Sequence, residues 1–455
     1  MTATDSDTTP RTEVTPGLVR DPEVGETEVR DPEVVQVVRR RRSEQERKGR
    51  GARRRPGARG LGGPRTVWWQ LASTIVFVVL LAVMAVVGYR ASRLITGGGT
   101  DRVTDPDAPG FVAEVRPTPV DLVAVTTDDG ALAGVVIAAA SGDGGGTVSA
   151  LPATISAGPG EDGLFPPIAD AYAAGGLDQL RSVLGTGLTF GFTSAEEVSA
   201  SDLTTLAGVV GPLTIKNVDN LIDSTDRGVV GMDPDKESVR YRAGEVTLEP
   251  GELAEFLAFS GIGEEPDRQM LRHLAVWEQL LAGIATKDMS SLATSSDGTS
   301  EDGGLAVVAD LMADLGGGAI TYEPVPLVQQ PIPGTYFTTM IPDEASLPTY
   351  VARVVPFPTS ATPGQRARVE LLNGTTNDQA TLLVAPKVVA AGGEISLLGN
   401  ADSFDKQATE VQYLAPEARE AAEEIAGALG VKATASSSAS GGVDVRVIVG
   451  ADRNS

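Results

Sequence analysis

The sequence predicts a mixed α/β protein that is held in a membrane by one helix and carries two folded domains behind it. A run of 23 uncharged, mostly apolar residues near the N-terminus (67–89) predicts the helix. Behind it, short apolar runs bounded by Gly and Asp alternate with segments of helical spacing, which is typical of α/β domains. The length of 455 residues alone suggests two or three domains.

Residues 1–66 are predicted to be a disordered, basic, cytoplasmic tail. Val19–Val24 returns ten residues later as Val29–Val34, and each copy holds a proline without any apolar periodicity. Twelve Lys and Arg lie within 39–65, beside the apolar run, where anionic inner-leaflet lipid explains them more simply than nucleic acid does. The threonines near the start fit either a docking or phosphorylation tail or a solvated leader, and both readings stay open.

Residues 67–89 are long enough to cross a hydrocarbon core of about 30 Å. Trp68 and Trp69 lie at one end of the run and Tyr89 at the other, where amphipathic rings favour the membrane interfaces. Because the positive charge precedes the run, the N-terminus is expected in the cytoplasm and the rest outside. A cleaved signal peptide fits less well, because the segment before its apolar core would hold 66 residues. We therefore expect a single-pass protein of the cell membrane.

The composition excludes several kinds of site. The chain has no cysteine, which excludes disulfides and thiolate chemistry, and its one histidine, His273, excludes a multi-histidine metal site. No metal site is therefore assigned. Residues 101–455 carry 20 Lys and Arg against 50 Asp and Glu. A field this acidic repels polyanions, so no nucleic-acid partner is expected.

The part after the membrane helix divides at two Pro- and Gly-rich segments. Residues 90–117 and 351–365 are predicted linkers, 118–350 an α/β/α layered domain, and 366–453 a small α/β domain. In the larger domain, the predicted strands are 121–126, 132–138, 147–151 and 213–217, and the helices are 166–184, 196–209, 250–259, 266–285 and 304–315. In the small domain, the predicted strands are 368–372, 394–398, 410–413 and 443–449, and the helices are 376–391 and 416–429.

Five segments of the small domain keep a distinctive order and spacing: Val369–Gly374, Gly392–Gly393, Gly399–Ala401, Thr409–Tyr413 and Asp444–Gly450. With them the domain resembles, over its whole length, the LytR C-terminal domain of bacterial envelope proteins. In physical terms, Gly374 follows a strand at a point where a positive φ costs glycine little. The turn at Gly399 offers backbone amides that either hold a carboxylate or sugar hydroxyl or serve only as a turn.

Four segments of the larger domain carry a second resemblance: Ser149–Pro152, Ile168–Gly176, Leu206–Thr214 and Glu249–Ala254. In order and local pattern, 118–350 resembles a divergent LytR-CpsA-Psr domain, whose helix at the second segment ends in paired glycines. That resemblance implies an outer domain that moves a glycopolymer from a polyprenyl pyrophosphate carrier onto peptidoglycan. It implies membrane lipid, lipid-linked glycopolymer, peptidoglycan and other wall-assembly proteins as partners, with Mg²⁺ as the cofactor of an active enzyme and none otherwise.

The catalytic pattern of that family is incomplete in this chain. The family places an arginine and an aspartate directly after the proline, where this chain has Ala153 and Thr154. The segment 255–265, where the family has further arginines, contains acids and no cation. Cleavage of a pyrophosphate requires cations that neutralise the phosphates. No catalytic residue is therefore assigned.

Two arginines remain as candidate ligands for phosphate, Arg268 and Arg272, which lie one helical turn apart on one face. The alternative is two surface arginines that pair with Glu264, Glu265 or Asp267. His273 could serve as a base, although a lone histidine on a helix is more often structural. Trp277 is expected in the core rather than under a sugar.

The sequence therefore predicts a membrane-anchored envelope protein, catalytically degenerate, that supports or regulates attachment of glycopolymers to peptidoglycan. Each lost contact to a phosphate removes about 1.5–3 kcal/mol of binding, which is the physical basis of that prediction. One alternative is an active phosphotransferase with relocated ligands and Mg²⁺. Another is a module that binds peptidoglycan through 366–453.

Overall fold

The computed structural model describes residues 103–453, apart from 143, 161–162, 224–238, 262–263, 287–302, 316–317, 333, 335–337 and 437–441. All of them belong to one compact unit of the chain. The predicted tail at 1–66, the predicted membrane helix at 67–89 and residues 90–102 of the predicted linker lie outside this part. Within the described residues, the structure contains no helix of the length and apolar character needed to cross a bilayer.

The larger domain is built on a five-stranded sheet with the order β10-β4-β3-β2-β5. Its centre is an antiparallel meander, because β2, β3 and β4 are joined by short turns, the first of them at Thr127–Gly130. The outer strands β5 and β10 pair parallel to β2 and β4. The strands are β2 (Val120–Thr126), β3 (Leu132–Ala140), β4 (Gly146–Pro152), β5 (Ser194–Val198) and β10 (Ile320–Tyr322).

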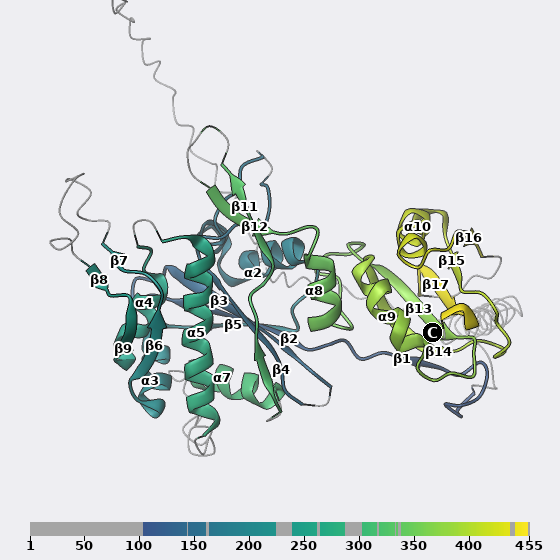
Figure 1. The fold of residues 1–455 in the computed structure, drawn as a ribbon, viewed down its shortest axis with the longest axis horizontal. Helices are drawn as coiled ribbons and strands as arrows, with labels where there is room; N and C mark the ends of the chain where they lie inside the picture. Colours follow the sequence, from purple (N-terminus) through teal and green to yellow (C-terminus); the bar gives the residue numbers. More distant parts are fainter. Residues whose placement is uncertain are drawn as a thin grey trace, which may run out of the picture. The chain divides into compact units, whose positions relative to one another are not determined.

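Helices cover both faces of this sheet (Figure 1). Successive residues of β2 alternate between the two faces, so Leu122 and Ala124 join one buried cluster and Val123 and Val125 the other. The first cluster contains α2 (Ile168–Leu188) and α8 (Leu347–Val354). The second contains α3 (Ala200–Val210), α4 (Leu253–Ala258), α5 (Pro266–Ala285) and α7 (Gly303–Asp314). The predicted mixed α/β class is confirmed.

Helix α2 covers nearly the range predicted for it, 166–184, and it is kinked at Gly175 and Gly176. In the resembling family the paired glycines end the helix, whereas here the helix continues beyond them to Leu188. Gly176 has φ 62° and ψ −151°, a conformation that side chains disfavour strongly. The glycines therefore bend the helix rather than end it, because the buried leucines beyond the bend continue to pack on the sheet.

Smaller elements surround this sheet. Two-stranded antiparallel ladders join β6 to β9, β7 to β8 and β11 to β12. Their bounds are β6 (Leu213–Asn217), β7 (Leu221–Ile222), β8 (Val239–Tyr241), β9 (Gly244–Leu248), β11 (Leu327–Pro331) and β12 (Thr338–Pro342).

The small domain contains a six-stranded sheet with the order β1-β14-β13-β17-β15-β16. The sequence predicted its four long strands and both helices, but not the two edge strands. Strand β16 is short, and β1 comes from the segment predicted as the first linker, so neither carries a recognisable apolar run. The elements are β1 (Val112–Glu114), β13 (Ala367–Asn373), α9 (Ala380–Ala390), β14 (Gly393–Asn400), β15 (Glu410–Tyr413), α10 (Arg419–Ala428), β16 (Ala433–Ala435) and β17 (Val445–Val449).

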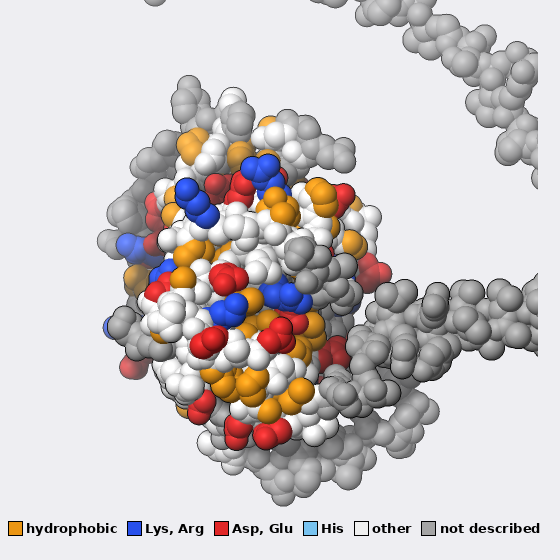
Figure 2. All heavy atoms as spheres, turned by 90° about the vertical axis from the view of Figure 1, so that its right-hand side faces the viewer, with side chains coloured by type: hydrophobic (Ala, Val, Ile, Leu, Met, Phe, Trp, Pro, Cys, Tyr) orange, Lys and Arg blue, Asp and Glu red, His pale blue; other side chains and the backbone are white. Residues whose placement is uncertain are grey.

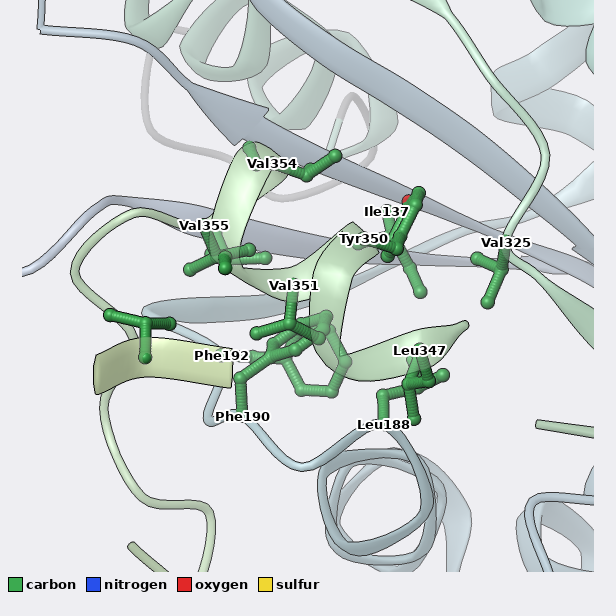
Figure 3. Close-up of a cluster of buried hydrophobic side chains, with 14 of the residues drawn as sticks. Ile137, Leu188, Phe190, Phe192, Val325, Leu347, Tyr350, Val351, Val354 and Val355 are labelled. Atoms are coloured by element: carbon green, nitrogen blue, oxygen red, sulfur yellow. The ribbon is translucent and has the colours of Figure 1, made fainter. Parts of the chain in front are cut away.

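The segment predicted as a second linker, 351–365, makes fixed contacts. Helix α8 runs into it, and Val351 and Val355 pack with Phe190 against the sheet (Figure 3). Beyond the helix, Gln365 donates hydrogen bonds to the carbonyls of Gly185 (3.3 Å) and Thr186 (3.1 Å) in α2. The first buried cluster continues from α8 into β13 and α9 of the small domain. The first part of the predicted linker is therefore packed into the core through its buried valines.

Arg366 fastens the same junction. Its side chain is buried, and its Nη1 donates to the carbonyl oxygen of Thr189 at 2.9 Å. Its Nε and Nη2 donate to the carbonyl oxygen of Gly393 at 3.2 and 3.1 Å. Burial lowers the pKa of Arg366 to about 10, which still leaves it charged at neutral pH. One guanidinium thus binds the carbonyl groups of both domains.

Candidate functional site

The candidate site lies where β4 ends, the position at which the resembling family carries its first arginine and aspartate. The chain turns after Pro152, since the amide of Ile155 donates to the Pro152 carbonyl at 3.3 Å. Thr154 then donates from Oγ1 to Oε1 of Gln269, on α5, at 2.8 Å. Gln269 is buried, and its Nε2 lies 3.5 Å from the carbonyl oxygen of Phe259. A neutral Thr–Gln–carbonyl chain of hydrogen bonds therefore lies at the end of β4.

Arg272, the first candidate ligand, is locked inside the domain. Its side chain and that of Glu264 are each 3% exposed, and Nε lies 2.8 Å from Oε1 of Glu264. Its Nη2 donates to Oε2 of Glu264 at 3.0 Å and to the Phe259 carbonyl at 2.7 Å, and its Nη1 donates to the Phe256 carbonyl. The guanidinium also lies 4.8 Å from the ring centre of Phe256. Arg272 thus fixes the segment between α4 and α5.

Arg268, the second candidate, points elsewhere. Its Nη1 contacts Oδ1 of Asp219 at 2.5 Å, and their side chains are 45% and 33% exposed. The hydrogen bond to Asp219 raises the pKa of Arg268 above its usual value. Arg268 and Arg272 therefore lie on the same helix but bind different carboxylates, Asp219 and Glu264. The sequence named Glu264 as a possible partner, whereas Asp219 is 49 residues away along the chain and no local pattern indicates it.

The charge of this region is negative. Residues 249–272 contain six Asp and Glu against two arginines, and both of those arginines are paired. Glu255 is paired with Arg240 at 2.7 Å, and Gln329 donates to Glu265 at 3.3 Å. Like charges at such a surface repel a pyrophosphate rather than bind it.

His273 is fully buried between α5 and β3. Burial, together with the charge of Arg272, lowers the pKa of His273 to about 3, so the ring is neutral at pH 7. A β-carbon added to Gly134 would lie 2.8 Å from this ring, so the two elements approach closely because position 134 is glycine. A base must meet solvent or substrate, and His273 meets neither.

Trp277 lies in the second core cluster, 1% exposed, with Leu274, Leu280 and Leu281. The prediction that it belongs to the core is confirmed. Among the described residues, no three His, Asp or Glu side chains are grouped as a metal site.

A groove of about 620 Å³ opens between the second half of α2 and the junction of β12 with α8. Its walls are small or apolar, with Ser182, Thr186 and Thr189 as the hydroxyl groups and Glu344 as its only charge. The groove therefore offers no cation to a phosphate group.

The turns that the sequence singled out in the small domain bind the chain itself. Asn373 accepts hydrogen bonds from the amide and hydroxyl of Thr375, both at 2.9 Å. The amide of Gly374 donates to the Val449 carbonyl at 2.9 Å. Asn400 binds residues 106–111, as described below. On the face of this domain seen in Figure 2, described Lys and Arg side chains are scattered among acidic and apolar ones.

Comparisons with known proteins identify the small domain. Residues 366–452 match the family model described as LytR cell envelope-related transcriptional attenuator. The chain thus carries a LytR C-terminal domain, as the sequence predicted. No curated protein matches the chain.

The chain is also similar to several solved structures. One is a LytR-Csp2A-Psr enzyme from Actinomyces oris, with 17% identity, a TM-score of 0.38 and coverage of 55% of this chain and 96% of that chain. Another is B. subtilis TagV, with 14% identity, a TM-score of 0.36 and coverage of 51% and 94%. A third, described as TagT bound to LIIa-WTA, has 12% identity, a TM-score of 0.38 and coverage of 56% and 92%.

Proposed function

We propose that this LytR C-terminal domain protein is a catalytically degenerate relative of the LytR-CpsA-Psr transferases. In this proposal it is anchored in the cell membrane by residues 67–89, with the folded domains outside and the N-terminus in the cytoplasm. It supports or regulates attachment of glycopolymers to peptidoglycan instead of performing the transfer. The observation that carries the proposal is the state of Arg272, which is buried and bound to Glu264 and to backbone carbonyls.

The energetics argue against Arg272 as a ligand for phosphate. Turning its guanidinium toward a substrate would break four hydrogen bonds and leave the buried carboxylate of Glu264 unpaired. Breaking a buried ion pair in this way costs about 3–5 kcal/mol. A new contact with a phosphate returns about 1.5–3 kcal/mol, so the structural pair is favoured.

The neutral chain at the end of β4 supports the same conclusion. Thr154 and Gln269 satisfy each other, and neither carries a charge that could stabilise a leaving phosphate. Of the two candidate arginines, only Arg268 lies at the surface, and it is paired with Asp219. One arginine among several carboxylates is a poor site for a pyrophosphate.

The proposal is tested by titrating the full-length chain, in lipid nanodiscs, with inorganic pyrophosphate and Mg²⁺ in a calorimeter. We expect no saturable binding tighter than about 1 mM, both for the wild type and for Arg268→Ala. The matched control is Arg419→Ala, which removes another exposed, carboxylate-paired arginine, this one from the small domain. Micromolar binding that weakens in Arg268→Ala and not in Arg419→Ala would overturn the proposal.

A further inference from the structure

The LytR C-terminal domain holds a segment from the other end of the described chain. Strand β1 pairs antiparallel with β14, with Val112 opposite Gly399 and Glu114 opposite Leu397. Beyond the strand, the amide of Val115 donates to the Ser396 carbonyl at 3.0 Å. Strand β1 is thus the edge strand of the six-stranded sheet next to β14, although it precedes the larger domain in the sequence.

Gly399 permits this close approach. A β-carbon built on Gly399 would lie 2.0 Å from the carbonyl oxygen of Phe111 and 2.8 Å from the α-carbon of Val112. Both obstacles are backbone atoms, which cannot turn aside as a flexible side chain does. Only glycine at 399 lets the two backbones meet.

Asn400 and Ala401 extend the grip toward the N-terminus. The side-chain amide of Asn400 donates to the carbonyl oxygens of Pro106 (2.7 Å) and Ala108 (2.9 Å). The backbone amide of Asn400 donates to the carbonyl oxygen of Phe111 at 2.7 Å. The amide of Gly110 donates to the Ala401 carbonyl at 2.9 Å. Residues 106–115 are therefore bound along their whole length, mainly through backbone groups.

We propose that the LytR C-terminal domain acts as a clamp on the membrane-proximal chain, binding residues 106–115 and thereby shortening the tether beneath the larger domain. This inference rests on the proposed anchor at 67–89. Without the clamp, residues 90–119 separate the anchor from β2, and 30 extended residues reach about 100 Å. With residues 106–115 bound, only the 16 residues 90–105 separate the proposed anchor from the clamp, and 16 extended residues reach about 55 Å.

The junction at Arg366 completes the restraint. Gln365 and Arg366 donate hydrogen bonds to α2 and to the turn after it. The small domain therefore binds the larger domain as well as residues 106–115. The larger domain is then held through the small one, close to the bilayer surface where lipid-linked precursors lie in the proposed function.

Hydrogen exchange measured by mass spectrometry on the full-length chain in nanodiscs tests the clamp. We expect the amides of Gly110 and Val115 to be protected in the wild type and to exchange at least tenfold faster in Gly399→Ala and in Asn400→Ala. The control is Gly427→Ala, since an added β-carbon there meets nothing within 4 Å. Continued protection of β13 and β17 shows that the domain remains folded. Unprotected amides in the wild type, or unchanged protection in both variants, would overturn the clamp.

A distance measurement separates the clamp from the anchor. The chain has no cysteine, so Glu196→Cys on the exposed part of β5 gives one labelling site for a donor dye. Energy transfer to acceptor lipids should fall when Gly399→Ala is added and stay unchanged with Gly427→Ala. If the chain fails to insert into nanodiscs, the proposed anchor is wrong. If it inserts but energy transfer is the same in Gly399→Ala, the shortening of the tether is wrong.

Discussion

Replacement of Arg272 distinguishes a structural arginine from a phosphate ligand. The side chains of Arg272 and Glu264 are each 3% exposed, so removing one partner leaves the other charge buried. Arg272→Ala should therefore destabilise the larger domain by about 3–5 kcal/mol. For a domain of this size, each kcal/mol lowers the melting temperature by about 2–4 °C, which gives a fall of roughly 6–20 °C.

Thermal unfolding of the full-length chain, followed by circular dichroism, measures this fall. Arg268→Ala is the matched control, because its ion pair is solvent-exposed and should leave the melting temperature within error. The double variant Arg272→Met with Glu264→Leu should recover much of the loss, since apolar replacement of both partners removes the buried charge. If Arg272→Ala unfolds at the wild-type temperature, Arg272 is not structural and the reasoning fails.

The remaining predictions concern three buried charged or titratable groups. Burial raises the pKa of Asp121 above 3.8, so its charge destabilises the fold at neutral pH. Asp121→Asn should therefore have a higher melting temperature than the wild type at pH 7. This difference in melting temperature should shrink as the pH falls toward 3.8. The pKa of His273 is about 3 in the folded chain and ordinarily 6.5, so protonation favours the unfolded chain. Stability is therefore lost as the pH falls from 6.5 toward 3, and His273→Gln should remove the part of this loss that comes from His273. Because the natural chain has one histidine, its NMR signal in an untagged sample should not titrate between pH 8 and 5, and a midpoint near 6.5 would refute the burial. Arg366→Ala should cost roughly 2–4 kcal/mol in denaturant unfolding, while the exposed Arg419→Ala should change little; equal effects would show that the junction is weak.

Much of the fold could be predicted because local patterns determine it. The meander β2–β3–β4 follows from apolar runs separated by Asp-Gly turns, and β13 and β17 follow from short, almost continuously buried apolar runs. The edge strand β1 could not be predicted in the same way. It has three residues between prolines, and its pairing with β14 depends on a contact nearly 300 positions away.

The candidate site was predictable in its residue types but not in its pairings. Absence of the family's charged pair was visible at Ala153 and Thr154, and Arg272 was named together with a neighbouring carboxylate. The sequence did not indicate that Gln269 is buried and bonded to Thr154, because a single polar residue on an amphipathic helix is usually exposed to solvent. Asp219 was also beyond reach, since only the folded chain brings it to Arg268.

Turnover of a lipid-linked substrate tests the central claim most directly. The full-length chain in nanodiscs is mixed with a polyprenyl pyrophosphate-linked glycopolymer, peptidoglycan and Mg²⁺, and release of polyprenyl phosphate is measured. The account predicts release at the rate of protein-free nanodiscs, for the wild type and for Arg268→Ala alike. Release well above that rate, reduced at least tenfold by Arg268→Ala, would contradict it.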